Sequence, residues 1–233
     1  MKLLVSLALS LAFCASFVDA QTTRPDAKKI ACVGDSITMG AGIKDRSHDS
    51  YPAQLQQMLG ADWQVKNFGS SGTTLLKKGD RPYWTQKQFT QAKEFAPDIV
   101  ILKLGTNDSK PQNWKFKDDA KPDLAAMVDE FQNLPSRPTI FLCRPVPAYP
   151  GFGGIRDDVI KNEVIPVIDE VAKEKNVKAI DLYAALSDKK ELFPDTVHPN
   201  AEGARLIAAA VYTALTGKPA PASAPSTEPA AAR

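Results

Sequence analysis

The sequence predicts an α/β fold, a three-layer α/β/α sandwich around a parallel sheet. Five short apolar segments alternate with segments in which apolar residues recur at helical spacing. Strands that alternate with helices form parallel sheets through right-handed crossovers, which place helices on both faces. The third apolar segment, residues 99–102, is apolar without alternation, as is typical of a central strand covered on both faces.

The predicted strands are residues 29–33, 63–68, 98–104, 139–143 and 177–182. Two predicted helices have apolar faces made of Tyr51, Leu55, Met58 and Leu59, and of Leu124, Met127, Val128 and Phe131. A third face consists of Val159, Val164, Val167, Ile168 and Val171. Pro166 lies inside that third helix and should kink it or break it in two. The last predicted helix, residues 201–216, stops at Gly217, and its inner face is predicted to be Leu206, Ile207, Ala210, Val211 and Leu215.

Length and composition indicate one ordinary globular domain. A chain of 233 residues can bury a substantial core, and contents of 43% hydrophobic and 24% charged residues are usual for a soluble protein. The net charge is +2, and the 29 basic and 27 acidic residues are interspersed. Because no basic stripe stands out, we expect no nucleic-acid partner.

The first twenty residues have the layout of a secretory signal peptide. Lys2 precedes an apolar run of about 16 residues, and cleavage is expected after Ala20. A membrane anchor is the alternative, but a spanning helix needs roughly 20 apolar residues. We therefore expect a secreted or periplasmic protein without stable membrane insertion. Residues 21–28 should form a linker, residues 29–217 the domain, and the Pro/Ala-rich residues 218–233 a disordered tail.

Gly34-Asp35-Ser36 directly follows the first predicted strand. A serine at this position lies at the carboxyl end of a parallel strand, where open α/β sheets place their active sites. A glycine turn with a capping side chain is the alternative, and the tripeptide alone does not decide between them.

Two polar loops follow the second and third predicted strands. Residues 67–74 read Asn-Phe-Gly-Ser-Ser-Gly-Thr-Thr, and glycines there let the backbone approach a ligand closely. Residues 105–108 read Gly-Thr-Asn-Asp and end the central strand. Each loop could be an ordinary turn when taken by itself.

Asp195 and His198 lie three residues apart, just before the last predicted helix. A nucleophilic serine needs a base within hydrogen-bond reach, and the base needs a partner that fixes its tautomer. The chain has two histidines, and the other one, His48, lies in a polar stretch that we interpret as a solvated loop. With only two histidines in the sequence, we expect no metal site built from several histidines.

Taken together and in this order, the four segments resemble the signature segments of the SGNH, or GDSL-type, hydrolase family. The resemblance covers residues 29 to 216 and implies a five-stranded, flavodoxin-like parallel sheet with strand order 2-1-3-4-5. It implies that Ser36 is the nucleophile, His198 the general base and Asp195 the partner of His198.

The resemblance also implies an oxyanion hole. Its donors would be the backbone N–H groups of Ser36 and Gly72 and the side-chain amide of Asn107. Asp108 is expected to brace the loop and to take no part in the chemistry. The reaction would need no metal and no other cofactor.

The family includes lipases, lysophospholipases, thioesterases, arylesterases and carbohydrate acetylesterases. We expect a serine esterase acting on short acyl, above all acetyl, esters of carbohydrates, because the chain has no long apolar insertion and export fits an extracellular glycan. Aromatic residues that could stack on a sugar, or simply pack, are Tyr83, Trp84, Trp114 and Tyr149. The alternatives are a lysophospholipase or general short-chain carboxylesterase, an acyltransferase, and a non-catalytic carbohydrate-binding protein. The oligomeric state is left open.

Cleavage after Ala20 would remove Cys14 and leave Cys32 and Cys143. The strand order implied by the family places the third strand between the strands that carry these two cysteines. Neighbouring strands are about 4.8 Å apart, and a disulfide needs Cα atoms within about 7 Å. We therefore expect two buried free thiols.

Overall fold

The computed structural model describes residues 23–151 and 153–222. Five parallel strands form one sheet in the order β2-β1-β3-β4-β5. They are β1 (Lys28–Gly34), β2 (Trp63–Gly69), β3 (Ile99–Lys103), β4 (Thr139–Arg144) and β5 (Lys178–Asp181). The predicted fold class and strand order are confirmed, and each predicted strand is found to within two residues of its observed ends. The predicted signal peptide and most of the predicted tail lie outside the described residues.

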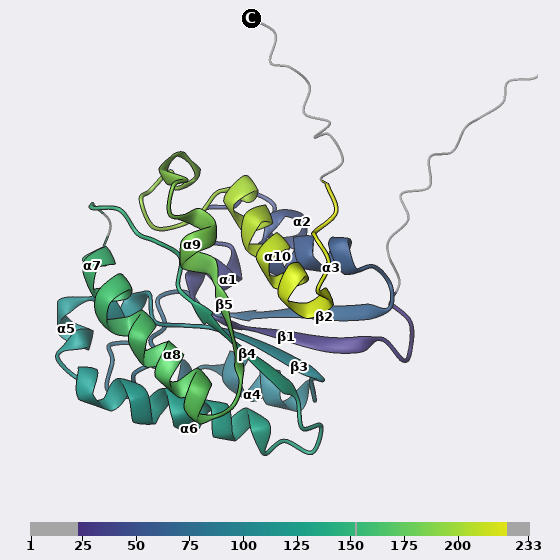
Figure 1. Ribbon diagram of the computed structural model, residues 1–233, viewed down its shortest axis with the longest axis horizontal. Coiled ribbons are helices and arrows are strands. Elements are labelled where there is room, and N and C mark those ends of the chain that lie inside the picture. The colour runs from purple at the N-terminus through teal and green to yellow at the C-terminus, as the bar shows by residue number, and fades with distance from the viewer. Residues whose placement is uncertain (1–22, 152, 223–233) are drawn as a thin grey trace, which may run out of the picture.

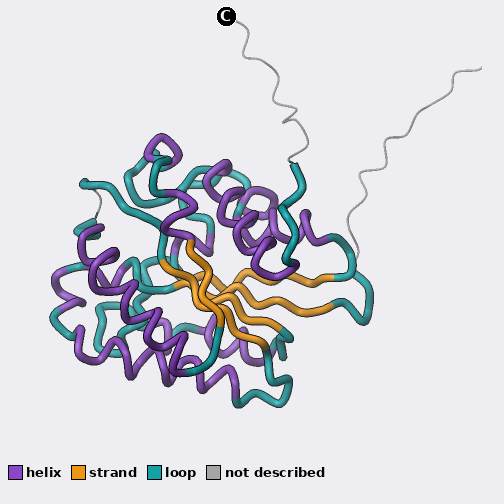
Figure 2. The backbone as a smooth tube through the Cα atoms, viewed as in Figure 1, coloured by secondary structure: helices purple, strands orange, loops and turns teal. Residues whose placement is uncertain are grey.

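Helices cover both faces of the sheet (Figures 1 and 2). The α-helices are α1 (Ser36–Met39), α2 (Arg46–Asp49), α3 (Tyr51–Leu59), α4 (Lys87–Glu94), α5 (Pro111–Trp114), α6 (Ala120–Gln132), α7 (Asp157–Val159), α8 (Ile165–Glu174), α9 (Leu182–Leu186) and α10 (Ala201–Thr216). Short 3₁₀ turns span Tyr83–Thr85, Asn107–Ser109, Lys117–Asp119 and Lys190–Leu192.

The strands divide the core into two layers because successive side chains point to opposite faces. Cys32 and Ile101 pack in one layer with α3, α9 and α10, whereas Val33 and Val100 pack in the other with α4, α6 and α8. The fully buried strand interiors explain why the central apolar run shows no alternation.

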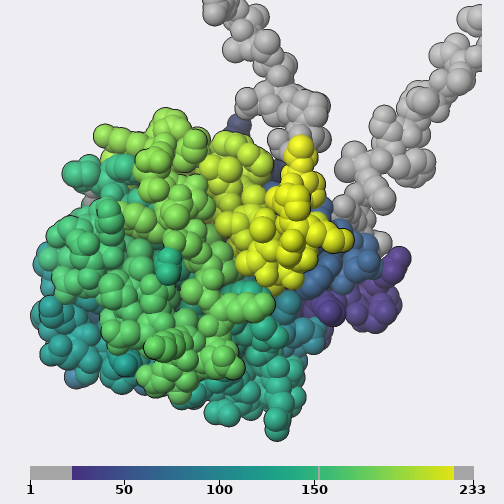
Figure 3. Space-filling model, viewed as in Figure 1, coloured from purple at the N-terminus to yellow at the C-terminus, as the bar shows by residue number. Residues whose placement is uncertain are grey.

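Helix α10 closes the fold against α3, where Gln54 Nε2 donates to the Ala201 carbonyl over 2.9 Å. Figure 3 shows the last of the described residues in yellow beside blue residues from the early part of the chain. The helix ends at Gly217, whose φ of 70° fits the left-handed cap predicted there. Its predicted inner face was partly wrong. The buried residues are Gly203, Ala204, Ile207, Ala208 and Val211.

That correction has a physical reason. Leu206, Ala210 and Leu215 are half-buried at the margins of the inner face, whose centre is occupied by small residues such as Gly203, Ala204 and Ala208. A larger residue would not fit at Gly203, because a Cβ there would lie 2.7 Å from the Cβ of Pro199 in the segment just before α10.

Pro166 is accommodated without breaking the helical path. Residues Ile160–Val164 form one wide π-helical segment between α7 and α8, and Pro166 takes an early position in α8. The wider turn relieves the clash that a proline ring makes with the preceding turn. Helix α4 was not predicted, because it buries only Phe89 and Ala92 and so shows little apolar periodicity.

The structure describes no helix in residues 23–151 and 153–222 that is long and apolar enough to cross a membrane.

Cys32 in β1 and Cys143 in β4 are both free and buried, as predicted, with β3 between their strands. Burial raises the pKa of Cys143 to about 12 and that of Cys32 above its ordinary range. We expect neither thiol of the folded protein to react with iodoacetamide at pH 8, and both to react after denaturation without reductant. Peptide mass spectrometry would measure this. A Cys32–Cys143 disulfide in the unreduced protein would contradict the structure.

Candidate active site

Ser36 begins α1 directly after β1, at the carboxyl edge of the sheet. The Asp35 side chain caps this short helix by accepting from the Ile37 N–H over 3.0 Å. Gly34 allows the tight turn, because a Cβ there would lie 2.2 Å from Thr38 Oγ1 and 2.5 Å from the Lys103 carbonyl oxygen. Ser36 is 5% exposed, so its hydroxyl is held in a nearly buried turn.

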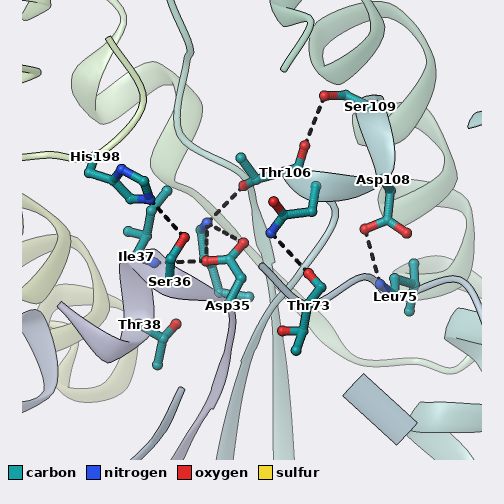
Figure 4. A network of polar contacts seen from close by, with 12 residues as sticks. Asp35, Ser36, Ile37, Thr38, Thr73, Leu75, Thr106, Asp108, Ser109 and His198 are labelled. Atoms are coloured by element: carbon teal, nitrogen blue, oxygen red, sulfur yellow. Dashed lines mark hydrogen bonds and ion pairs between the residues drawn. The ribbon is translucent and has the colours of Figure 1, made fainter. Parts of the chain in front are cut away.

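The structure brings Ser36, His198 and Asp195 together in one hydrogen-bonded chain. His198 Nε2 lies 2.8 Å from Ser36 Oγ, and His198 Nδ1 lies 2.6 Å from Asp195 Oδ2. Figure 4 shows the His198 ring and the Ser36 hydroxyl pointing toward each other, with a dashed line between them. Residues 162 positions apart meet because β1 and the loop before α10 end at the same edge of the sheet. The arrangement can move a proton from the serine to the imidazole.

The loop from Asp195 to His198 is folded back on its own carboxylate. Asp195 Oδ1 accepts from the backbone N–H groups of Val197 at 3.0 Å and His198 at 2.7 Å. Burial opposes the ionisation of Asp195, but these hydrogen bonds and the His198 ring outweigh it and lower the pKa of Asp195. The carboxylate therefore stays charged at neutral pH and can hold the ring in one orientation.

Thr196 carries the strain of this loop. Its φ is +75°, a left-handed conformation that is unfavourable for a β-branched residue. Its Oγ1 is buried and has no hydrogen-bond partner among the described residues. Such strain costs on the order of 1–3 kcal/mol and persists only where the surroundings impose it. The loop from residue 145 imposes part of it, since Tyr149 N–H donates to the Thr196 carbonyl over 2.8 Å.

The two predicted oxyanion loops lie against each other. Asn107 Nδ2 donates one N–H to the carbonyl oxygen of Thr73 over 3.0 Å, which leaves the second N–H of that amide for another acceptor. Gly72 precedes Thr73 and has a φ of +74°, which favours glycine. Asn107 is 6% exposed, so its amide is fixed in a largely buried setting.

Asp108 braces the glycine loop, as expected. Its two carboxylate oxygens accept from the backbone N–H groups of Leu75 at 3.0 Å and Leu76 at 2.8 Å. Burial raises the pKa of Asp108 to about 6, although these hydrogen bonds oppose the change. Because its pKa is higher in the folded than in the unfolded protein, Asp108 contributes most to stability when it is protonated, at a pH below its unfolded pKa. That contribution is lost as the pH rises through about 6.

One buried charge at this edge was not predicted. Lys103 ends β3 and is fully buried, and its Nζ lies 3.0 Å from both oxygens of Asp35 and 2.9 Å from Thr106 Oγ1. The sequence feature that could have indicated this contact is a lysine in an otherwise apolar central strand, because buried lysines are nearly always paired.

Two of the four aromatic residues considered for sugar stacking are core residues. Tyr83 is fully buried and donates to the Phe68 carbonyl over 2.6 Å, and Trp114 is 6% exposed and donates to Glu163 over 2.9 Å. The half-buried Trp84 has Lys77 Nζ 4.2 Å from the centroid of its ring. Tyr83 and Trp114 therefore pack inside the protein and are not available to stack on a sugar ring. Tyr149 remains half-buried beside the loop that carries Thr196.

His48 is exposed, as expected, but its segment forms the short helix α2 and not the predicted loop. Its ring contacts Asp49 over 2.7 Å. Among the described residues, no group of three His, Cys, Asp or Glu side chains is placed to hold a metal ion.

Two hollows in the structure lie away from Ser36. One, of about 290 Å³, is lined by Asp26, Ala27, Lys28, Asp62 and Trp63 at the amino ends of β1 and β2. The other is an interior gap with no room for a water molecule, lined by Leu75, Leu102, Leu104, Leu124, Leu142, Cys143 and Ile168. This part of the apolar core is thus closely packed.

Comparison with known proteins identifies relatives by sequence. The sequence profile of the GDSL-like lipase/acylhydrolase family matches residues 32–206. An acetylxylan esterase from Xylanibacter ruminicola is 40% identical over 210 residues, covering 82% of this chain and 44% of that protein. A multidomain esterase from Ruminococcus flavefaciens is 34% identical over 115 residues, covering 48% of this chain and 14% of that protein. The chain spans less than half the length of either relative.

Solved structures share the fold. The carbohydrate acetylesterase Est24 from Sinorhizobium meliloti aligns with a TM-score of 0.67 at 19% identity, covering 82% of this chain and 99% of that one. The acetylxylan esterase Axe2 from Geobacillus stearothermophilus aligns with a TM-score of 0.62 at 22% identity, covering 84% and 96%. At these low sequence identities, the comparison shows a shared fold and carries no conclusion about activity.

Proposed function

This chain belongs to the GDSL-like lipase/acylhydrolase family, and within that class of carboxylic ester hydrolases we propose that it is a serine esterase for acetylated carbohydrates. The observation that carries the proposal is the hydrogen-bonded chain from Ser36 Oγ through the His198 ring to Asp195. A binding protein without catalysis would have no need of such a proton path.

The proposed reaction is an acyl transfer in two steps. His198 Nε2 takes the Ser36 proton while Ser36 Oγ attacks the ester carbonyl carbon, and the charged Asp195 stabilises the imidazolium. The protonated His198 then gives its proton to the leaving sugar hydroxyl, which leaves an acyl-serine. Water attacks that acyl group in the same manner, releases the acid and restores Ser36.

The developing oxyanion would be stabilised by donors that are fixed before the reaction. We assign this role to the backbone N–H groups of Ser36 and Gly72 and to the free N–H of the Asn107 amide. Donors that are already in place need no reorganisation when the charge appears, which is why they lower the barrier.

An acetylated carbohydrate is favoured as the substrate for two reasons. The relative that shares 40% identity over 82% of this chain is an acetylxylan esterase. The sequence also has no long apolar insertion of the kind that would hold a long acyl chain. Residues 1–20 further lead us to propose export, which fits a polysaccharide outside the cell.

A panel of esters that varies acyl length and alcohol separately tests this function. We expect kcat/KM to be higher for acetyl than for octanoyl esters of one alcohol by about tenfold or more, because the chain has no apolar insertion that would bind the longer acyl group. Acetylated xylo-oligosaccharides should be better substrates than acetyl esters of simple alcohols. A kcat/KM that rises beyond butyryl would indicate a lipase or lysophospholipase, and acyl transfer to added sugar would indicate a transferase.

Esterase activity is expected to rise between about pH 5 and about pH 8 and to stay high at mildly alkaline pH. Only a neutral imidazole can accept the serine proton, and free imidazole titrates near about pH 6.5. The lowered pKa of Asp195 keeps that group charged throughout. A kcat/KM profile with its maximum near about pH 4 would instead indicate a carboxylate base.

A further inference from the structure

Lys103 is a charged residue buried at the carboxyl end of β3, the central strand of the sheet. It is 0% exposed, and so is its partner Asp35. Taking two charges out of water is costly, and apolar residues of similar size at such positions often give equal or greater stability. Stability alone therefore does not account for the pair.

The ammonium contacts two segments and is satisfied by three oxygen atoms. Two belong to Asp35, at 3.0 Å each, and the third is Thr106 Oγ1, at 2.9 Å. Lys103 can thus tie the end of β1 to the loop after β3. Gly34 and Lys103 are register partners on these neighbouring strands, so the two segments leave the sheet at the same level.

Each partner of Lys103 directly precedes a residue of the proposed active site. Asp35 precedes Ser36, and Thr106 precedes Asn107. In Figure 4, Asp35 and Thr106 lie between the Ser36 side and the Asp108 side of the site, and dashed lines join both to the same nitrogen. One ammonium group thus connects the residue before the proposed nucleophile with the residue before the proposed oxyanion donor.

We propose that Lys103 is a positioning residue for the esterase reaction, holding Ser36 and Asn107 in register through Asp35 and Thr106. This inference rests on the function proposed above. An error of about 1 Å in the position of a reacting or stabilising group can lower a rate about 100-fold, so a fixed spacing matters to the transition state.

The Thr106 branch allows the cleaner test. Asp35 also caps α1 through the Ile37 N–H, so replacing Asp35 would disturb the helix as well. The Thr106 hydroxyl has Lys103 as its hydrogen-bond partner among the described residues. Thr106→Val removes that hydroxyl at nearly constant shape and leaves the Lys103–Asp35 ion pair in place.

We expect Thr106→Val to lower kcat for an acetyl ester about tenfold at nearly unchanged KM, because the loss falls on the transition state. Thr106→Ser restores the hydroxyl and should restore most of the rate. In an Asn107→Ala background, Thr106→Val should have little further effect, because the group that it positions is already gone. A merely structural role for Thr106 would instead lower kcat by the same factor in both backgrounds.

The double variant Asp35→Asn/Lys103→Met tests the whole contact without leaving a buried charge unpaired. The asparagine can still accept from the Ile37 N–H. We expect a folded protein by circular dichroism, with kcat lowered at least as far as in Thr106→Val. Wild-type kcat in either Thr106→Val or the double variant would overturn the inference. Wild-type activity in Ser36→Ala would instead overturn the proposed function, so the two failures are distinguishable.

Discussion

Replacement of Ser36 by alanine is expected to lower kcat for an acetyl ester by about 10⁶-fold. The Ser36 hydroxyl is the only group in the hydrogen-bonded chain that can form the acyl-enzyme, and His198 Nε2 lies 2.8 Å from it. His198→Ala should cause a loss of similar size, because the hydroxyl is a poor nucleophile without its base. The double variant should lose little more, since residues of such a chain act as a unit.

His48→Ala is the matched control, because His48 is the second histidine of the sequence and is exposed in α2. It should keep wild-type kcat and KM. Mass spectrometry after treatment with a fluorophosphonate should find the label on Ser36 and none on the Ser36→Ala variant. Wild-type turnover by Ser36→Ala, or a label on another serine, would remove the basis of the proposed mechanism.

The layered fold could be predicted because each strand carries its own signal. The run at residues 99–102 is apolar on both sides, and the structure buries it between α6 and α8 on one face and α10 on the other. The strand order was available only through resemblance to the SGNH family, because alternation fixes the layers but not which strands are neighbours. The order 2-1-3-4-5 and the family membership are both confirmed.

The residues placed at the candidate site were predictable for a similar reason. Ser36 and Asn107 lie in segments that follow β1 and β3, and His198 lies in the loop before α10, which comes to the same edge of the sheet, so Ser36 and His198 meet although 162 residues separate them. The packing around them was less predictable. Whether Trp114 faces solvent or Glu163 depends on contacts between α5 and the π-helical segment before α8, which no local pattern encodes.

The contact made by Lys103 could not be derived from spacing. Its partners Asp35 and Thr106 come from two different strand ends, and the pairing appears only once β1 and β3 are neighbours. The lysine did stand out chemically, since a charge in a central strand needs a partner. The sequence could therefore indicate that a partner exists, whereas the fold identifies it.

Asn107→Ala is expected to lower kcat by about 10²- to 10³-fold with little change in KM. The amide would interact with the substrate oxygen mainly when that oxygen becomes negative, so the loss falls on the transition state and not on substrate binding. Asn107→Asp should be slower still, because a carboxylate would face the developing oxyanion. Steady-state kinetics on one acetyl ester would measure all three proteins.

The structural part of the effect can be separated from the chemical part. Asn107 Nδ2 also donates to the Thr73 carbonyl over 3.0 Å, and losing a buried hydrogen bond of this kind costs about 1 to 3 kcal/mol of stability. Thermal unfolding of Asn107→Ala should show that loss, while kinetics well below the melting temperature report the folded enzyme alone. If the folded variant kept wild-type kcat, the amide would be a brace for the glycine loop and not an oxyanion donor. A kcat loss of the expected size in a folded variant would support the oxyanion role, with the backbone N–H groups of Ser36 and Gly72 as the remaining donors.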